Sequence, residues 1–160
     1  MIDGSGLPWR CVAMVAGGIA NILHRDTIAA LVGNKVFERG EACFESGRVL
    51  RVEAARGELR GSVRPELRGR AVYAVRIWLR DDGLAYECTC PMGVQRQFCK
   101  HAVAIALAHL EKERQEAEQE FALLRERVKA MDPSVLVERL LEHARINPNL
   151  TAVLAQLTEE

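Results

Sequence analysis

The amino-acid sequence predicts an α+β fold with a small antiparallel sheet and a C-terminal helical extension. Three observations support this fold class. Apolar residues alternate at period two from Ala71 to Leu79, which is typical of a half-buried strand. The Asp-Asp-Gly run at 81–83 has the composition of a tight turn. From His101 onward the chain is rich in Ala and Leu and contains no helix breaker, which indicates a helix.

The N-terminal segment, residues 1–25, is apolar and rich in glycine, and its pattern assigns it no role. Its apolar stretch, residues 11–23, is shorter than the ~20 apolar residues that a membrane-spanning helix needs. An acidic residue, Asp3, stands where a signal peptide carries positive charge. We therefore expect a cytoplasmic protein that does not bind membranes. A short helix is predicted next, over residues 26–36, and its first two residues, Asp and Thr, are good caps.

Glycines divide the stretch between this helix and the main strand. Gly40 and Gly47 are predicted to mark turns. Residues 49–54 alternate in polarity as a strand does, and Gly57 and Gly61 then punctuate a hairpin. This pattern predicts additional strands that precede the main one along the chain.

The strongest strand is predicted over residues 70–80, and the turn after it leads into a partner strand over residues 84–90. Cys88 and Cys90 share a face of this partner strand, because side chains at i and i+2 project to the same side. Pro91 ends the strand, since proline has no N–H to donate to a sheet.

Three helices are predicted after the sheet. The first begins at His101 and extends as a charged connector. The second begins at Pro133 with Asp132 as its cap, and Asn147-Pro148 repeats the same start signal for the third. The predicted parts are the N-terminal segment 1–25, a domain over 26–110, a connector over 111–131 and a helical pair over 132–160.

The five cysteines point to metal binding rather than to disulfides. Three of them, Cys88, Cys90 and Cys99, lie within twelve residues of sequence. An odd number with this clustering argues against the disulfide framework of a secreted domain. Cys11 and Cys43 are isolated and are expected to bind nothing, because free cysteine is often a small buried hydrophobe.

The pattern Cys88-Thr-Cys90, eight residues, then Cys99-Lys-His101 suits tetrahedral zinc. The first pair projects from a strand, and the second lies at a helix start, where free backbone N–H groups favour a thiolate. Gly93 lets the intervening loop bend. Four protein ligands close the coordination shell, which predicts one structural Zn²⁺ and argues against a hydrolytic site. The alternatives are a chance cluster in a core and a redox dithiol.

This pattern resembles the SWIM-type zinc finger, in which CxC and CxH pairs are separated by a variable loop. The flanks Tyr86–Pro91 and Cys99–Ala104 are similar to the CTCP and CKH-A motifs of that family, and residues 39–49 resemble the lead-in of its bacterial members. The likeness covers roughly residues 26–110. It implies a ββα zinc unit and a role in binding DNA or other proteins. Some relatives accompany helicase-like ATPases or transposases, but none of those catalytic motifs occurs in this sequence.

Charge is distributed unevenly along the chain although the formal net charge is +0. Residues 48–80 contain nine arginines and three glutamates, and residues 111–160 contain eleven acidic and seven basic residues. Arginines beside an aromatic residue can contact phosphate and stack on bases. The candidate nucleic-acid contacts are Arg70, Arg76, Trp78, Arg80, Arg96 and Lys100. Alternatively, Trp78 packs against a helix and the arginines pair with Glu113, Glu116 or Glu120.

The predicted function is therefore zinc-dependent recognition of nucleic acid or of a protein, without catalysis or a small-molecule substrate. A protein–protein adaptor without nucleic-acid binding is the alternative. A zinc enzyme or a thiol redox protein is a weaker alternative, because the sequence has no Ser/His/Asp set, paired carboxylates or HExxH motif. His24, His109 and His143 stand alone and are expected on the surface or beside the metal ligands.

Overall fold

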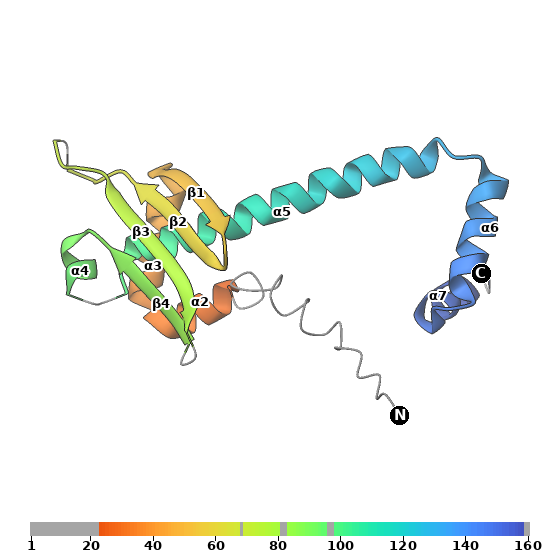
Figure 1. The fold of residues 1–160 in the computed structure, drawn as a ribbon, viewed down its shortest axis with the longest axis horizontal. Coiled ribbons are helices and arrows are strands. Elements are labelled where there is room, and N and C mark those ends of the chain that lie inside the picture. Colours follow the sequence, from red (N-terminus) through yellow and green to blue (C-terminus); the bar gives the residue numbers. More distant parts are fainter. Residues whose placement is uncertain (1–22, 68, 81–82, 96–97, 159–160) are drawn as a thin grey trace, which may run out of the picture. The chain divides into compact units, whose positions relative to one another are not determined.

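The computed structural model describes residues 23–67, 69–80, 83–95 and 98–158. It has the predicted α+β architecture, with a four-stranded antiparallel sheet, helices before and after it, and a C-terminal helical region (Figure 1). The chain divides into two compact units, Met1–Arg114 and Gln115–Glu160. The first holds the sheet and the cysteine cluster, and the described part of the second consists of helices joined by short turns.

The sheet is a meander in which each strand pairs with the next. Its order is β1 (Val49–Ala55), β2 (Glu58–Val63), β3 (Tyr73–Arg80) and β4 (Gly83–Cys88), and every pair is antiparallel. The β1–β2 turn places Arg56 at φ 54° and Gly57 at φ 78°. Two successive positive φ values match the twist of a two-residue hairpin, so the turn predicted at Gly57 is confirmed. The turn at residues 81–82 lies outside the described residues.

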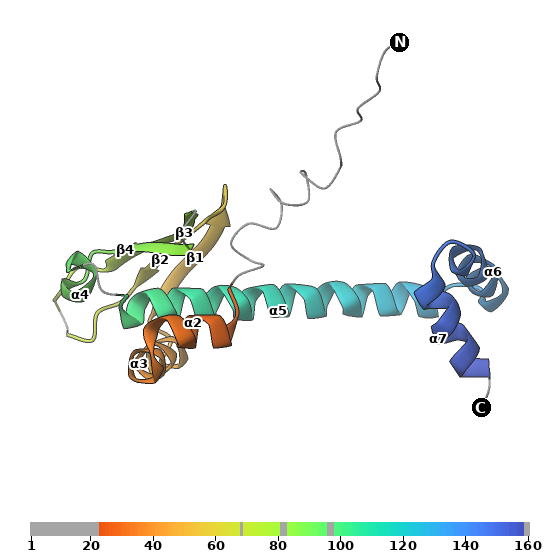
Figure 2. The same ribbon diagram turned by 90° about the horizontal axis from the view of Figure 1, so that it is seen from below.

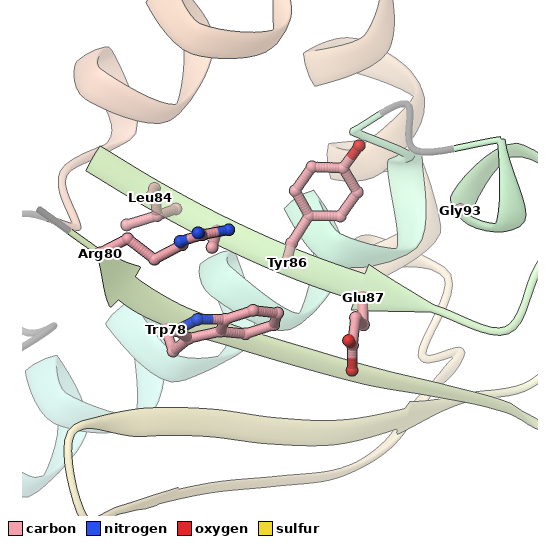
Figure 3. A pocket seen from close by; sticks show the side chains of 7 residues that line it. Trp78, Arg80, Leu84, Tyr86, Glu87 and Gly93 are labelled. Atoms are coloured by element: carbon pink, nitrogen blue, oxygen red, sulfur yellow. The ribbon is translucent and has the colours of Figure 1, made fainter. Parts of the chain in front are cut away.

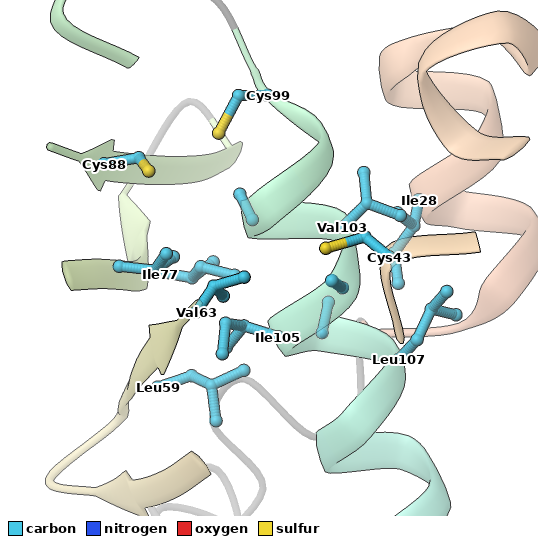
Figure 4. Close-up of a cluster of buried hydrophobic side chains, with 14 of the residues drawn as sticks. Ile28, Cys43, Leu59, Val63, Ile77, Cys88, Cys99, Val103, Ile105 and Leu107 are labelled. Atoms are coloured by element: carbon cyan, nitrogen blue, oxygen red, sulfur yellow. The ribbon is translucent and has the colours of Figure 1, made fainter. Parts of the chain in front are cut away.

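The first part of helix α5 (Lys100–Lys129) forms the centre of the hydrophobic core, and residues 101–109 are buried without interruption. The sheet covers one side of this segment, and helices α2 (Arg25–Val32) and α3 (Asn34–Glu45) cover the other (Figure 2). Figure 4 shows Ile105 facing Leu59, Val63 and Ile77 of the sheet. A helix that is apolar on all sides is suited to this enclosed position.

Two glycines that were predicted to mark turns or hairpin punctuation instead lie inside regular elements. Gly40 belongs to α3, where a Cβ atom would stand 2.4 Å from Cβ of Val103. Gly61 belongs to β2, where a Cβ atom would stand 2.2 Å from Cδ1 of Ile105. Both predictions were wrong. The absence of a side chain at these two positions instead lets α3 and the sheet approach α5 closely. The turn predicted at Gly47 is present, with φ 65°.

The N-terminal helix region also differs from the prediction. Helix α2 starts at Arg25 with His24 as its N-cap, and Asp26 lies in the first turn. The carboxylate there is close to the positive end of the helix dipole, so it stabilises the same terminus without being the cap. The helix ends at Val32, and α3 follows after Gly33 at φ 77°. One predicted helix is therefore two.

The second unit consists of the end of α5 followed by α6 (Pro133–Ala144) and α7 (Pro148–Thr158). Asp132 Oδ1 accepts hydrogen bonds from the backbone N–H groups of Ser134 at 2.8 Å and Val135 at 3.4 Å. Asn147 Oδ1 likewise accepts from N–H groups in the first turn of α7. Both predicted start signals are confirmed. Among the described residues, none of the helices combines the length and apolarity that crossing a membrane requires.

Candidate metal centre

The four predicted ligands come together at one end of the core. Cys88 is the last residue of β4, Cys90 precedes helix α4 (Pro91–Val94), and Cys99 and His101 lie at the start of α5. Each contributes one possible ligand atom, and these atoms all lie within 4.8 Å of one another. All four residues are buried, and Figure 4 shows Cys88 and Cys99 beside the apolar side chains.

Cys90 does not lie on the strand, contrary to the prediction. Strand β4 ends at Cys88, and Thr89 N donates to Ala74 O at 3.1 Å. Cys90 then acts as the N-cap of α4, with its sulfur accepting from Gly93 N at 3.3 Å. Pro91 starts this helix as well as following the strand, because proline fits the first helical position. The turn from strand to helix, not strand periodicity, brings the two sulfurs together.

Gly93 contributes space to this turn. A Cβ atom on Gly93 would stand 2.3 Å from the Cys88 carbonyl oxygen and 2.6 Å from Cys88 Cβ. No side chain fits there without moving the backbone that carries a ligand. The sequence-based expectation gave Gly93 a flexible role in the loop, whereas the structure gives it a steric one.

In the absence of a metal ion, the three thiol groups differ in how readily they lose a proton. The Cys88 thiol hydrogen bond lowers the pKa of Cys99 to about 4, although burial opposes this, and His101 and the Ala102 N–H contribute in the same direction. Hydrogen bonding to Cys99, followed by burial, raises the pKa of Cys88. Burial raises the pKa of Cys90. Three thiolates cannot therefore coexist in this buried place unless a cation compensates their charge.

The donor set fits a single structural zinc ion. A tetrahedral ion with Zn–S bonds of ~2.3 Å places its ligand atoms ~3.8 Å apart. The Cys88 sulfur lies 4.0 Å from Nδ1 of His101, so the observed cluster is close to that size. Sulfur and imidazole donors favour zinc over magnesium or calcium, which prefer oxygen. Cys88, Cys90, Cys99 and His101 would hold the ion, and four protein ligands close its shell.

Aromatic side chains position the second ligand pair. The Tyr73 and His101 ring centroids lie 4.7 Å apart, and those of Tyr86 and Phe98 lie 4.4 Å apart. Phe98 immediately precedes Cys99, so its contact with Tyr86 ties the end of the ligand loop to β4. Neither Tyr73 nor Phe98 was among the residues predicted to support the site. Their positions could have identified them, because Tyr73 faces the core at the start of a strand and Phe98 is adjacent to a ligand.

The predicted nucleic-acid residues fall into two groups. Arg76, Trp78 and Arg80 belong to β3, whereas Arg70 precedes this strand and lines a small pocket together with Lys100. Arg96 lies outside the described residues. The described members of the predicted patch therefore lie in two places: one group is on the sheet, and the other is beside the cysteine cluster.

Arg76 of β3 meets glutamates that were not predicted as its partners. Arg76 Nε donates to Glu58 Oε2 at 2.5 Å across the β2–β3 pair, and its guanidinium lies 4.8 Å from the Trp78 ring centroid. The Arg76 hydrogen bond lowers the pKa of Glu58. Figure 3 shows Trp78, Arg80 and Glu87 around a pocket of about 440 Å³. Trp78 remains on the sheet surface instead of anchoring a helix.

The other cysteines and histidines lie apart from the cluster or outside the described residues. Cys43 is buried in the core as a small hydrophobe, and Cys11 is not among the described residues. His24 and His143 are exposed, as expected. His109 is buried in α5, with Nε2 3.3 Å from a carboxylate oxygen of Glu113, so it does not occupy the surface, one of the two positions expected for it.

The comparison with protein families supports the same site. The family model described as the SWIM zinc finger matches residues 73–110, a segment that contains all four cluster residues. No curated protein and no solved structure matches the chain. Residues 73–110 therefore match the SWIM zinc finger family, and the buried Cys/His cluster within them fits one structural zinc ion.

Proposed function

We propose that residues 23–114 are a zinc-stabilised recognition module that binds a protein partner and carries out no chemical step. The observation that carries this proposal is a groove of about 630 Å³ next to the cysteine cluster. One wall is the turn between β4 and α4, and the other is the segment that leads into β3. The metal ligands thus hold one of the walls in place.

The groove has the composition of a docking site for an apolar side chain. Its lining includes Ala71, Val72, Pro91 and Val94, with Arg70 also present. Val94 is 73% exposed, which is unusual for a β-branched apolar residue in a compact unit. Exposed apolar surface that adjoins a polar group is typical of protein interfaces.

The charges on the sheet favour a protein over nucleic acid as the partner. Arg60 and Arg76 both pair with Glu58, and Arg51 pairs with Glu53. A surface that binds phosphate through counterion release needs an excess of positive charge, and these pairs reduce that excess. Nucleic acid remains the second candidate, because the exposed Arg76 guanidinium lies over Trp78 and could stack on a base.

Selection of displayed peptides on the zinc-loaded protein tests the proposal. We expect peptides with an apolar anchor, and Val94→Asp should reduce their affinity by about tenfold or more, because a buried charge replaces apolar contact. Met92→Asp is the matched control, since Met92 is 49% exposed on the same helix but does not line the groove. Equal binding by both variants would refute the groove as the site.

Nucleic-acid binding is tested in parallel by fluorescence anisotropy with single- and double-stranded DNA at two salt concentrations. The protein proposal predicts no binding at ~50 mM salt, where phosphate contacts are strongest. Tight binding that Arg76→Ala abolishes would instead support the second candidate.

A further inference from the structure

Apolar side chains recur along α5 at alternating intervals of three and four residues. After Leu110 the next position of the series is occupied by Arg114, and the apolar series resumes with Ala117, Phe121, Leu124 and Val128. This spacing repeats every seven residues, which is the pattern of a coiled-coil seam. In heptad notation Phe121 and Val128 occupy a positions, and Ala117 and Leu124 occupy d positions.

The seam is exposed where α5 passes through the second unit. Phe121 is 67% exposed, and more than half of the Leu124 side-chain surface is also accessible. A surface hollow of about 540 Å³ is lined by both residues and by Ala117. None of the residues from 115 to 157 is buried. A helix with an uncovered heptad seam is expected to gain stability by packing against another helix.

The charged residues beside the seam change sign along the helix. The e positions are Glu118 and Arg125, and the g positions are Glu120 and Arg127. All four are exposed. The first heptad is therefore flanked by acidic residues and the second by basic residues. Such a helix is complementary to a copy of itself that runs in the opposite direction, because e and g charges set partner choice and orientation.

We propose that two copies of this chain associate through α5 as an antiparallel two-stranded coiled coil. In antiparallel packing a positions face d positions, so Phe121 meets Leu124 of the second copy and Ala117 meets Val128 of the second copy. This one register also places Glu118 opposite Arg125 of the second copy, and Glu120 opposite Arg127 of the second copy. The two-fold symmetry repeats every pair.

The opposite orientation is less favourable. In a parallel pair the g position of one helix faces the following e position of the other, which brings Glu120 against Arg125 of the second copy but also Glu113 against Glu118 of the second copy, a repulsive pair. Both orientations bring apolar a and d residues together, so the flanking charges decide between them. Only the antiparallel register sets each of the residues Glu118, Glu120, Arg125 and Arg127 opposite a charge of the other sign. This inference concerns residues 115–131 and is independent of the groove beside the cysteine cluster.

Light scattering coupled to size-exclusion chromatography tests the association in the full chain. We expect a concentration-dependent dimer, and Phe121→Asp should convert it to a monomer. Ala122→Asp is the matched control, because Ala122 is exposed on the same helix at a b position and does not line the hollow beside Phe121. Stoichiometric zinc in both variants shows that the first unit remains folded. A wild-type chain that stays monomeric at about 100 µM would overturn the proposal.

Charge reversal tests the predicted register. Glu118→Arg with Glu120→Arg, and separately Arg125→Glu with Arg127→Glu, should each weaken the homodimer about tenfold or more, because like charges then face each other. Mixing the two variants should restore dimers, since every flanking pair becomes opposite in sign. Failure of the mixture to dimerise would contradict the register.

Cysteine cross-linking tests the orientation. A chain with Ala117→Cys mixed with a chain with Val128→Cys should form an interchain disulfide under mild oxidation. Ala117→Cys alone should not, because the two copies of residue 117 are far apart in the antiparallel dimer. The unsubstituted chain controls for the native cysteines. Efficient self-cross-linking of Ala117→Cys would indicate a parallel pair and overturn the proposal.

Discussion

Gly93 is the residue on which the shape of the metal centre depends most directly, because a Cβ atom there would stand 2.3 Å from the Cys88 carbonyl oxygen. We expect Gly93→Ala to reduce the free energy of unfolding of the zinc-loaded protein by about 1–3 kcal/mol, the usual cost of overpacking. Zinc affinity should fall as well, because Cys88 must move. Chelator competition and denaturant titration measure the two effects. Val94→Ala, one residue further along α4, should leave zinc affinity unchanged, and an equal loss there would contradict the steric role of Gly93.

Protons compete with zinc for the sulfur atoms. The pKa of Cys88 and the pKa of Cys90 are raised in the metal-free site, so both thiols are protonated at neutral pH, whereas the low pKa of Cys99 leaves a thiolate. Zinc binding should therefore release about two protons, and the apparent affinity should rise about a hundredfold per pH unit near pH 7. Competition with a chromophoric chelator at two pH values measures this slope. An affinity that does not change with pH would show that the thiols are already ionised.

At the scale of elements, a substitution where α3 contacts α5 has two opposing effects on stability, one from helix propensity and one from packing. Alanine has a higher helix propensity than glycine, so Gly40→Ala on its own should stabilise α3 by about 1 kcal/mol. The added Cβ would stand 2.4 Å from Val103 Cβ, and overpacking costs about 1–3 kcal/mol. We expect net destabilisation in a denaturant titration. Glu38→Ala, an exposed change in the same helix, should alter the free energy of unfolding little. A more stable Gly40→Ala variant would show that the helices can separate without loss.

Elements whose signals are local could be predicted from the sequence. The strand that contains Val75 and Ile77, and the helix capped by Asp132, follow from periodicity and capping within a few residues. Gly40 and Gly61 were misinterpreted because their reasons are contacts with Val103 and Ile105, which lie far away in sequence. A glycine that permits close approach and a glycine that makes a turn look alike in a single sequence.

The candidate site shows the same division between local and long-range information. The spacing of Cys88, Cys90, Cys99 and His101 was enough to predict one metal centre, because four such ligands in fourteen residues restrict the chemistry strongly. The position of Cys90 was wrong, since Pro91 can both end a strand and start a helix. The partner of Arg76 was missed because Glu58 becomes its neighbour only through the β2–β3 register.

For the whole molecule, the two compact units predict that folding of the zinc finger and self-association can be separated. The zinc ligands all lie in the first unit, and the exposed seam after Arg114 lies in the second. Structural zinc contributes on the order of 10 kcal/mol in zinc-finger peptides, which is comparable to the entire stability of a small domain. Removing it with a chelator should therefore lower the melting temperature of the first unit by tens of degrees.

Self-association should survive this treatment, because the seam of α5 contains no metal ligand. Analytical ultracentrifugation of the chelated protein should still show a dimer, and circular dichroism should show that the sheet signal is lost while helical signal remains. The complementary variant, Phe121→Asp, should retain zinc and its melting temperature but sediment as a monomer. Two results together would contradict this separation: the chelated protein becomes monomeric, and the Phe121→Asp variant loses zinc. The two units would then fold as one, because each change would affect the unit on the other side of the boundary near residue 114.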